Sequence, residues 1–156
     1  MKADPKVIAD LQTAGGVLAS MVEQFRVDIR LMKGGDQKYS AAMISGWYED
    51  AEAHLGKILK RLVCFESDPG YSIASPQGGA DPVAIMKRQL TAAQAAFTQF
   101  CVFRQNSWNI RADSVCDLFE HAVQFLEKVV FKLEMELRLV GLLTPAGYIG
   151  ARLEDA

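Results

Sequence analysis

The chain has 156 residues, of which 50% are hydrophobic and 23% are charged, and its formal net charge is −2. A chain of this size and composition can bury a core and differs from a disordered segment, so we expect one globular domain over residues 1–156. The near-neutral charge and the lack of a basic stretch with interleaved aromatics argue against nucleic acid as a partner. No apolar run is long enough to span a bilayer, and the polar N-terminus is unlike a signal peptide, so we expect a cytoplasmic protein.

The three cysteines, Cys64, Cys101 and Cys116, are far apart in the sequence and lie in apolar segments. They form no CxxC pair. We therefore expect reduced cysteines packed in the core, without a zinc or redox role.

Two helices are expected in the first part of the chain. The first begins after Asp4, because Asp followed by Pro5 is a typical N-cap and first-turn pair, and the glycines at 34–35 should end it. The second is expected to begin at Asp36 as its cap. Their apolar stripes, spaced at the helical period, are Val7, Leu11, Ala14, Leu18, Val22, Phe25 and Ile29, and then Ile44, Trp47, Ala51, Leu55, Ile58 and Leu62.

Residues 66–82 are rich in Pro, Gly and Ser and have no helical period, which predicts a long irregular link. Asp81 and Pro82 repeat the start signal for a third helix that gives way near Asn109. Asp113 should cap a fourth helix and Gly141 should end it, after which residues 144–153 should form a last short helix. The stripes are Met86, Leu90, Ala93, Phe97, Phe100 and Cys101, and then Leu118, Ala122, Leu126, Val129, Leu133, Leu137 and Val140.

The connectivity follows from these link lengths. Short links join the first helix to the second and the third to the fourth, and the long link joins the two pairs. The fold class is therefore expected to be all-α, a ferritin-like four-helix bundle with a long crossover between helices 2 and 3 and a short C-terminal fifth helix.

The stretch WYEDAEAHLGKILKRL, which starts at Trp47, places three acids and one of the two histidines close together. On a helical wheel Ala51 is at the centre of the buried face, His54 is at its edge, and Glu52 is on the opposite side. His54 and Glu52 therefore cannot bind one metal from this helix. A di-iron bundle needs inward Glu-x-x-His pairs, because carboxylates neutralise hard iron cations in a dry interior. The position three before His54 holds Ala51, whose methyl group cannot do this.

His54 has two interpretations. In the first it is a histidine at the edge of the core, hydrogen-bonded to Gln94 on the buried face of the third helix. In the second it forms a weak inner-surface metal site with Asp50, four residues earlier, or with Gln94. His121 is expected to be a surface or packing histidine on the flank of its helix.

The chain resembles the bacterioferritins over nearly its whole length, and four segments carry the resemblance. These are MKADPKVI at the start, KILKRLVCFES, LEMELRLVG, and GYIGARL after a glycine break. The resemblance implies a hollow 24-subunit cage that stores ferric mineral, with a ferroxidase centre in each bundle. It also implies a haem b between two-fold-related subunits, ligated by a methionine from each.

The functional residues of that family do not carry over. The resemblance puts its six di-iron ligand positions on Leu18, Ala51, His54, Gln94, Leu126 and Val129, assuming a one-residue deletion before the fourth helix. Without the deletion the last two positions would be Glu127 and Val130. The deletion is preferred because it places Leu126 and Val129 on the apolar stripe. The haem-ligand position holds Glu52, so no haem is expected there.

Three functions are then open. The first is a structural or storage subunit of an iron-storage cage without ferroxidase activity, in a homo-oligomer or together with a ligand-complete bacterioferritin. The second is a ferroxidase with rearranged ligands. The third is a metal-free interaction module in another complex, for which Tyr39, Trp108 and the Tyr148 tail are candidate contacts. No cofactor is expected inside the bundle, although an iron mineral would fill a cage.

Overall fold

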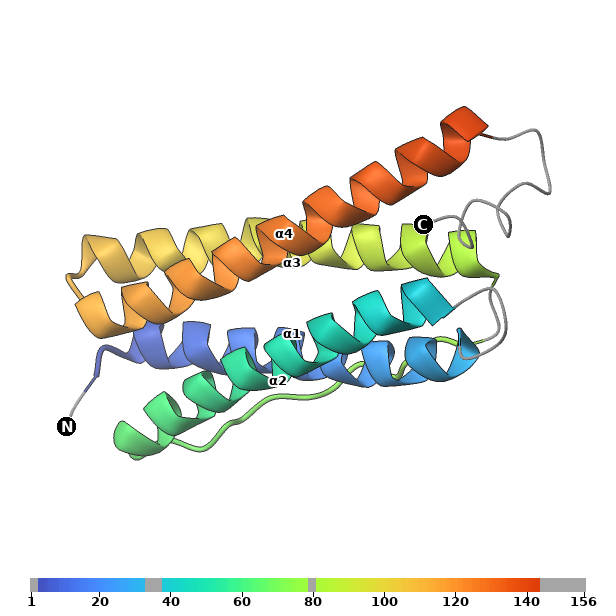
Figure 1. Ribbon diagram of the computed structural model, residues 1–156. Coiled ribbons are helices and arrows are strands. Elements are labelled where there is room, and N and C mark those ends of the chain that lie inside the picture. Colours follow the sequence, from blue (N-terminus) through green and yellow to red (C-terminus); the bar gives the residue numbers. More distant parts are fainter. Residues whose placement is uncertain (1–2, 33–37, 79–80, 144–156) are drawn as a thin grey trace.

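The computed structural model describes residues 3–32, 38–78 and 81–143. Within them the chain forms four helices and no strand: α1 (Pro5–Leu31), α2 (Lys38–Cys64), α3 (Pro82–Asn109) and α4 (Asp113–Leu143). The helices are arranged as a four-helix bundle in which α1 packs against α2 and α3 packs against α4, with less contact between the two pairs (Figure 1). The expected all-α class is confirmed.

Two of the expected helix starts are confirmed. The Asp4 carboxylate accepts a hydrogen bond from the Lys6 amide at 2.8 Å, and the Asp81 carboxylate accepts one from the Ala84 amide at 2.8 Å. In both cases a proline occupies the first turn, where a backbone donor would have no helical acceptor. The Asp-Pro pair is a specific signal because both residues act in the same turn. The aspartate accepts a hydrogen bond from a free backbone amide, and the proline has no amide hydrogen that would need an acceptor.

Two other boundaries were predicted wrongly. Asp113 is the first residue of α4 and not its cap, since the Cys116 amide donates to the Ala112 carbonyl at 2.9 Å. Gly141 does not end α4, which continues to Leu143. A single glycine weakens a helix by only about 1 kcal/mol, which packing overrides. The double glycine at 34–35, the expected cap Asp36 and the short helix expected after residue 143 lie outside the described residues.

The core takes large side chains from all four helices. The expected stripes supply most of it, including Leu18, Ile44, Phe100 and Leu126. The first turns of α4 differ, because Leu118 is only partly buried. The fully buried aromatic there is Phe119, whose ring lies 6.1 Å from that of Phe100 in an edge-on contact. The cysteine prediction was wrong for Cys64, which is exposed at the end of α2, while Cys101 and Cys116 are partly buried; all three are free thiols.

The link after α2 lies alongside α1. The Gln12 side-chain amide donates to the Asp68 carbonyl at 3.0 Å. Three turns further along α1, Gln24 pairs with the backbone of Gln77 through two hydrogen bonds of 2.8 Å each. The link therefore follows α1 in the same chain direction and ends near the start of α3 (Figure 1).

Two glycines inside α1 allow this close approach. A Cβ at Gly16 would lie 3.1 Å from the Tyr71 Cβ and 3.3 Å from the Ser72 carbonyl oxygen. A Cβ at Gly15 would lie 3.3 Å from the Tyr71 ring. Gly15 and Gly16 thus cost the helix some propensity but leave room for the link against it.

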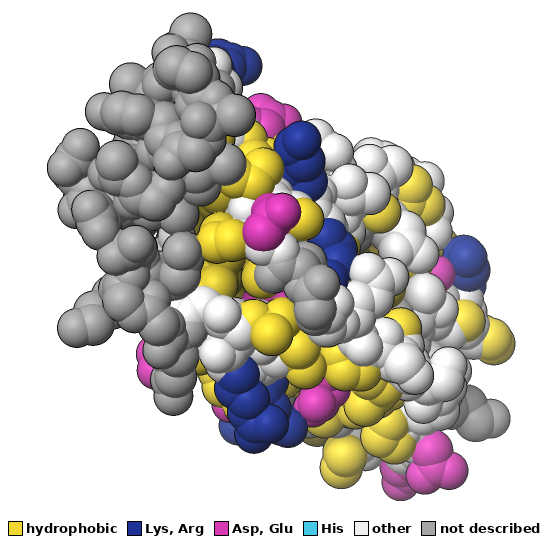
Figure 2. Space-filling model, turned by 90° about the vertical axis from the view of Figure 1, so that its right-hand side faces the viewer, with side chains coloured by type: hydrophobic (Ala, Val, Ile, Leu, Met, Phe, Trp, Pro, Cys, Tyr) yellow, Lys and Arg dark blue, Asp and Glu magenta, His cyan; other side chains and the backbone are white. Residues whose placement is uncertain are grey.

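Charges of both signs are mixed on the end of the bundle where α4 ends and α3 begins (Figure 2). Hydrophobic side chains lie between them, and neither sign forms a continuous patch on the described part of this face. Among the described residues, no helix is both long and apolar enough to cross a bilayer.

Candidate functional site

Four of the six positions assigned to a di-iron centre lie in one apolar cluster. Leu18 comes from α1, Ala51 from α2, and Leu126 and Val129 from α4, and all four are fully buried. Their neighbours in the cluster are hydrophobic side chains. The middle of the bundle therefore presents methyl and methylene groups where a metal centre would need carboxylates and imidazoles.

The other two positions do not join this cluster. Gln94 is exposed, and its amide donates to the Glu134 carboxylate on α4 at 3.3 Å. The predicted placement of Gln94 on the buried face was therefore wrong, and so was its hydrogen bond to His54. His54 is half-buried and packs its ring against that of Phe125, with the ring centroids 5.2 Å apart.

The surroundings of His54 disfavour its charged form. Burial is the main cause that lowers the pKa of His54 below its usual value, and the positive charge of Lys57 adds to it. The carboxylate of Asp50 opposes this shift, and His121 reinforces it. His54 is thus close enough to Asp50 for an electrostatic interaction, and its ring packs on an aromatic side chain. The weak metal site predicted for this pair stays a prediction.

We expect stability to fall as the pH drops below about 6.5, the pKa of an unperturbed histidine. The folded-state pKa of His54 is the lower one, so the unfolded chain binds more protons in this range. The contribution of neutral His54 is therefore present above the unfolded-state pKa and lost as the pH falls through the folded-state pKa. Melting temperatures at several pH values should show a flatter profile for His54→Gln. The control His121→Gln, at an exposed histidine, should keep most of the dependence, and equal profiles for both variants would contradict the assignment.

The remaining predicted residues are exposed or only partly buried. Glu127 is exposed and Val130 is partly buried, whereas Leu126 and Val129 are fully buried, which agrees with the burial expected for the preferred correspondence. Glu52 and Asp50 are exposed on α2. In the described part of the chain, no group of three or more His, Cys, Asp or Glu side chains is arranged to hold a metal ion.

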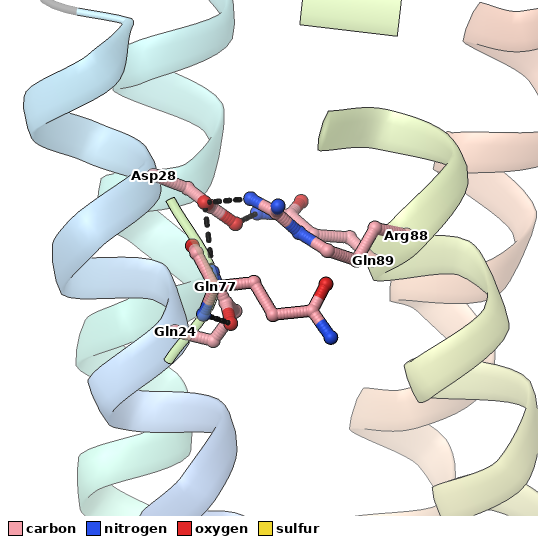
Figure 3. A network of polar contacts seen from close by, with 5 residues as sticks. All are labelled: Gln24, Asp28, Gln77, Arg88 and Gln89. Carbon is pink, nitrogen blue, oxygen red and sulfur yellow. Dashed lines mark hydrogen bonds and ion pairs between the residues drawn. The ribbon is translucent and has the colours of Figure 1, made fainter. Parts of the chain in front are cut away.

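The most developed polar site is one that the sequence interpretation missed. Asp28 of α1 is fully buried, and its carboxylate accepts hydrogen bonds from three side chains (Figure 3). Arg88 binds one oxygen at 2.6 Å, Gln89 binds the other at 2.7 Å, and Gln24 adds a bond of 3.0 Å. Gln24 in turn holds Gln77 of the link. One carboxylate therefore joins α1, α3 and, through Gln24, the link.

An open groove of about 800 Å³ runs beside this network, between α1, the link and α3. Small side chains such as Gly16, Ala92 and Ala95 line its walls, together with side-chain amides including Gln24. Arg88 and Gln89 line the groove where it meets the Asp28 network, and Arg88 is the one charged side chain among the groove's described lining residues.

A sequence signal for this network did exist. Asp28 follows Phe25 by three residues, so it occupies a core position of the first stripe. Gln89 lies three residues after Met86 and four before Ala93, again in core register. Two polar residues at core positions of different helices indicate a buried pair, because neither could remain unpaired inside.

Comparison with protein-family models and with curated proteins found no match to this chain. The resemblance to bacterioferritins thus depends on the four segments described above and on the helix pattern.

Proposed function

We propose that the chain is a bacterioferritin-like subunit of an iron-storage cage that does not itself oxidise iron. The observation that carries this proposal is the apolar cluster of Leu18, Ala51, Leu126 and Val129 at the middle of the bundle. A carboxylate buried there without a metal would cost several kcal/mol, and hydrophobic side chains remove that cost. The subunit then folds without iron and contributes shell and inner surface.

The path of the link supports the ferritin-like topology in this proposal. Its hydrogen bonds follow α1 from Gln12 to Gln24, so it spans much of the bundle's length before α3 begins. Such a path suits a crossover that lets α2 and α3 run in the same direction. The short terminal helix of the family would be formed by residues beyond Leu143.

In a mixed cage the chemistry would be divided between subunits. A ligand-complete bacterioferritin would oxidise Fe(II), and the present chain would extend the shell that encloses the mineral. Haem b is not expected at the family position, because the carboxylate of Glu52 cannot replace a methionine thioether. Exposed Asp50 would supply an acid for the inner surface, with His54 beside it as a weak metal contact.

The decisive experiment measures native mass and iron oxidation on the same preparation. The mass of the purified protein is determined alone and after co-expression with a ligand-complete bacterioferritin. Oxygen uptake is then recorded after addition of Fe(II). We expect a cage near 24 subunits in at least one case and only the slow background oxidation for the chain alone. Oxygen uptake in proportion to subunit would instead support a ferroxidase with rearranged ligands.

Removal of metal should have little effect on this protein. We expect the melting temperature to be unchanged by EDTA, because no part of the folding free energy depends on a bound ion. Adding Fe(II) back under argon should likewise leave it unchanged. A fall of more than about 4 °C with the chelator would reveal a stabilising metal site and contradict the proposal.

A metal-free interaction module is the second candidate, and one observation favours it. Trp108 at the end of α3 is 66% exposed, and Phe131 on α4 is 64% exposed. Large aromatic side chains at the surface are typical contact residues in protein interfaces. A dimer or hetero-complex in the native mass measurement, without any cage, would favour this candidate.

A further inference from the structure

The link meets α1 at four regularly spaced points. In order along both segments, the α1 residues are Gln12, Gly16, Ser20 and Gln24, and their link partners are Asp68, Tyr71, Ala74 and Gln77. The α1 positions are four residues apart and therefore lie along one ridge of the helix, while the link positions are three residues apart. Three of the four contacts are hydrogen bonds between an α1 side chain and the link backbone. The ridge of α1 thus holds the link through its main chain.

Residues 68–78 of the link contribute no fully buried side chain. Tyr71 is partly buried and the others are exposed. In the part of the chain that the structure describes, every hydrogen bond that attaches residues 68–78 to a helix is made with α1. Detachment of this segment would expose little apolar surface and would leave the contacts between the helices in place. Few buried contacts and exposed hydrogen bonds are typical of a segment that opens locally.

The attachment at Gln24 has a fixed orientation. Gln24 Nε2 donates to the Asp28 carboxylate at 3.0 Å and to the Gln77 carbonyl at 2.8 Å, and Gln24 Oε1 accepts from the Gln77 amide at 2.8 Å (Figure 3). An ionised carboxylate only accepts hydrogen bonds, so the Gln24 amide group cannot turn over without losing Asp28. One end of the segment is therefore held by a donor and an acceptor that are already in place.

We propose that residues 68–78 form a strap that opens from α1 as one unit while the four helices stay packed. In the closed state the strap covers Gly15 and Gly16 and forms one wall of the groove. In the open state this face of α1 is uncovered. The strap is a conformational device of the fold, because its attachments are polar, lie on one helix and are separate from the hydrophobic core.

Hydrogen exchange of single backbone amides tests this proposal on the full-length protein, by mass spectrometry with fragmentation. The amides of Ala74 and Gln77 report closure, because each donates to an α1 side chain. We expect these two amides to have similar protection and to exchange at least tenfold faster than amides in the middle of α4. Protection equal to that of the α4 amides would show that the segment opens only when the whole protein unfolds, and would overturn the proposal.

A matched pair of glycine variants separates the strap from the bundle. A Cβ at Gly16 would lie 3.1 Å from the Tyr71 Cβ, whereas a Cβ at Gly46, inside α2, would have no atom within 4 Å. Alanine favours the helix at both positions. Gly16→Ala should therefore push the strap away and speed exchange at Ala74 and Gln77 at least tenfold, without lowering the melting temperature. Gly46→Ala should leave exchange at both amides unchanged.

Three results with these glycine variants would contradict the proposal. The first is unchanged exchange in Gly16→Ala, and the second is equal acceleration in both variants. The third is a fall in the melting temperature of Gly16→Ala by more than about 2 °C, which would show that the segment is part of the cooperative core.

The variant Gln24→Leu tests whether the strap opens as one unit. It removes both hydrogen bonds to Gln77 but none to Ala74, whose amide donates to Ser20. Opening as a unit predicts faster exchange at Ala74 as well as at Gln77. Gln99→Leu, at an exposed α3 position that lines the same groove, should leave both amides unchanged. Acceleration at Gln77 alone would show independent fraying of one end and overturn the proposal.

Discussion

Replacing Asp28 with alanine is expected to lower the free energy of unfolding by about 3–5 kcal/mol. Asp28 has no exposed surface, and its partner Arg88 has a side chain that is only 19% exposed. Without the carboxylate the guanidinium would remain mostly buried and uncompensated, and the amides of Gln24 and Gln89 would each lose an acceptor. The loss of one side chain would therefore weaken the attachment of α3 and, through Gln24, of the link.

Urea unfolding monitored by circular dichroism would measure this effect. The matched control is Glu120→Gln. It removes an ion pair in which Arg104 and Glu120 lie 3.0 Å apart and have side chains that are 35% and 42% exposed, respectively. Exposed pairs contribute about 0–1 kcal/mol, so this control should be nearly neutral. The double variant Asp28→Leu/Arg88→Met should recover much of the loss, because it removes both charges together. If Asp28→Ala is no worse than Glu120→Gln, the network is not the buried anchor described here.

Replacing Leu126 with glutamate is expected to destabilise the protein by about 4 kcal/mol or more. The new carboxylate would enter the middle of the apolar cluster, next to hydrophobic side chains that offer it no hydrogen bond. A metal ion is not expected to rescue the variant, because Leu18, Ala51 and Val129 supply no further ligands. This variant distinguishes a filled core from a hidden metal-binding interior.

The control for shape is Leu126→Met, a volume-conserving change that should cost less than about 1.5 kcal/mol. The control for charge is Gln124→Glu, at an exposed position of the same helix, which should shift stability by less than about 0.5 kcal/mol. Thermal and urea unfolding with and without Fe(II) or Zn²⁺ would complete the comparison. A Leu126→Glu variant as stable as Leu126→Met would show that the centre of the bundle admits water or ions.

Local signals explain which parts of the fold were predictable. Asp4 with Pro5, and Asp81 with Pro82, satisfy backbone donors within their own first turns, so these starts do not depend on distant residues. The apolar period likewise identified Leu18, Ala51 and Val129 as buried, since one face of each helix must leave water. The prediction that α4 ends at Gly141 was wrong because the end of a helix depends on the packing of its last turn as well as on helix propensity.

The candidate site was harder to predict. Gln94 follows the buried Ala93 directly, yet it is exposed and pairs with Glu134 of α4. The buried face of α3 runs through Gln89, Ala93, Ala96 and Phe100, and Gln94 lies outside it. Asp28 and Gln89 were visible as polar residues in core register, but their common partner Arg88 is 60 residues from Asp28 in the chain. Residues so far apart in the chain form no local sequence pattern, so their pairing could not be predicted from spacing.

The sequence by itself determined that the chain is helical, where two helices begin, and that Leu18, Ala51 and Val129 belong to apolar faces that are buried. These properties depend on residues within a few turns of one another. They can therefore be predicted from the helical spacing of apolar residues and from the N-cap residues. Only the tertiary structure decided that His54 packs on Phe125, that Asp28 collects three donors, and that the link leaves a groove beside α1. Such contacts join residues far apart in the chain, and their geometry exists only once the helices have packed.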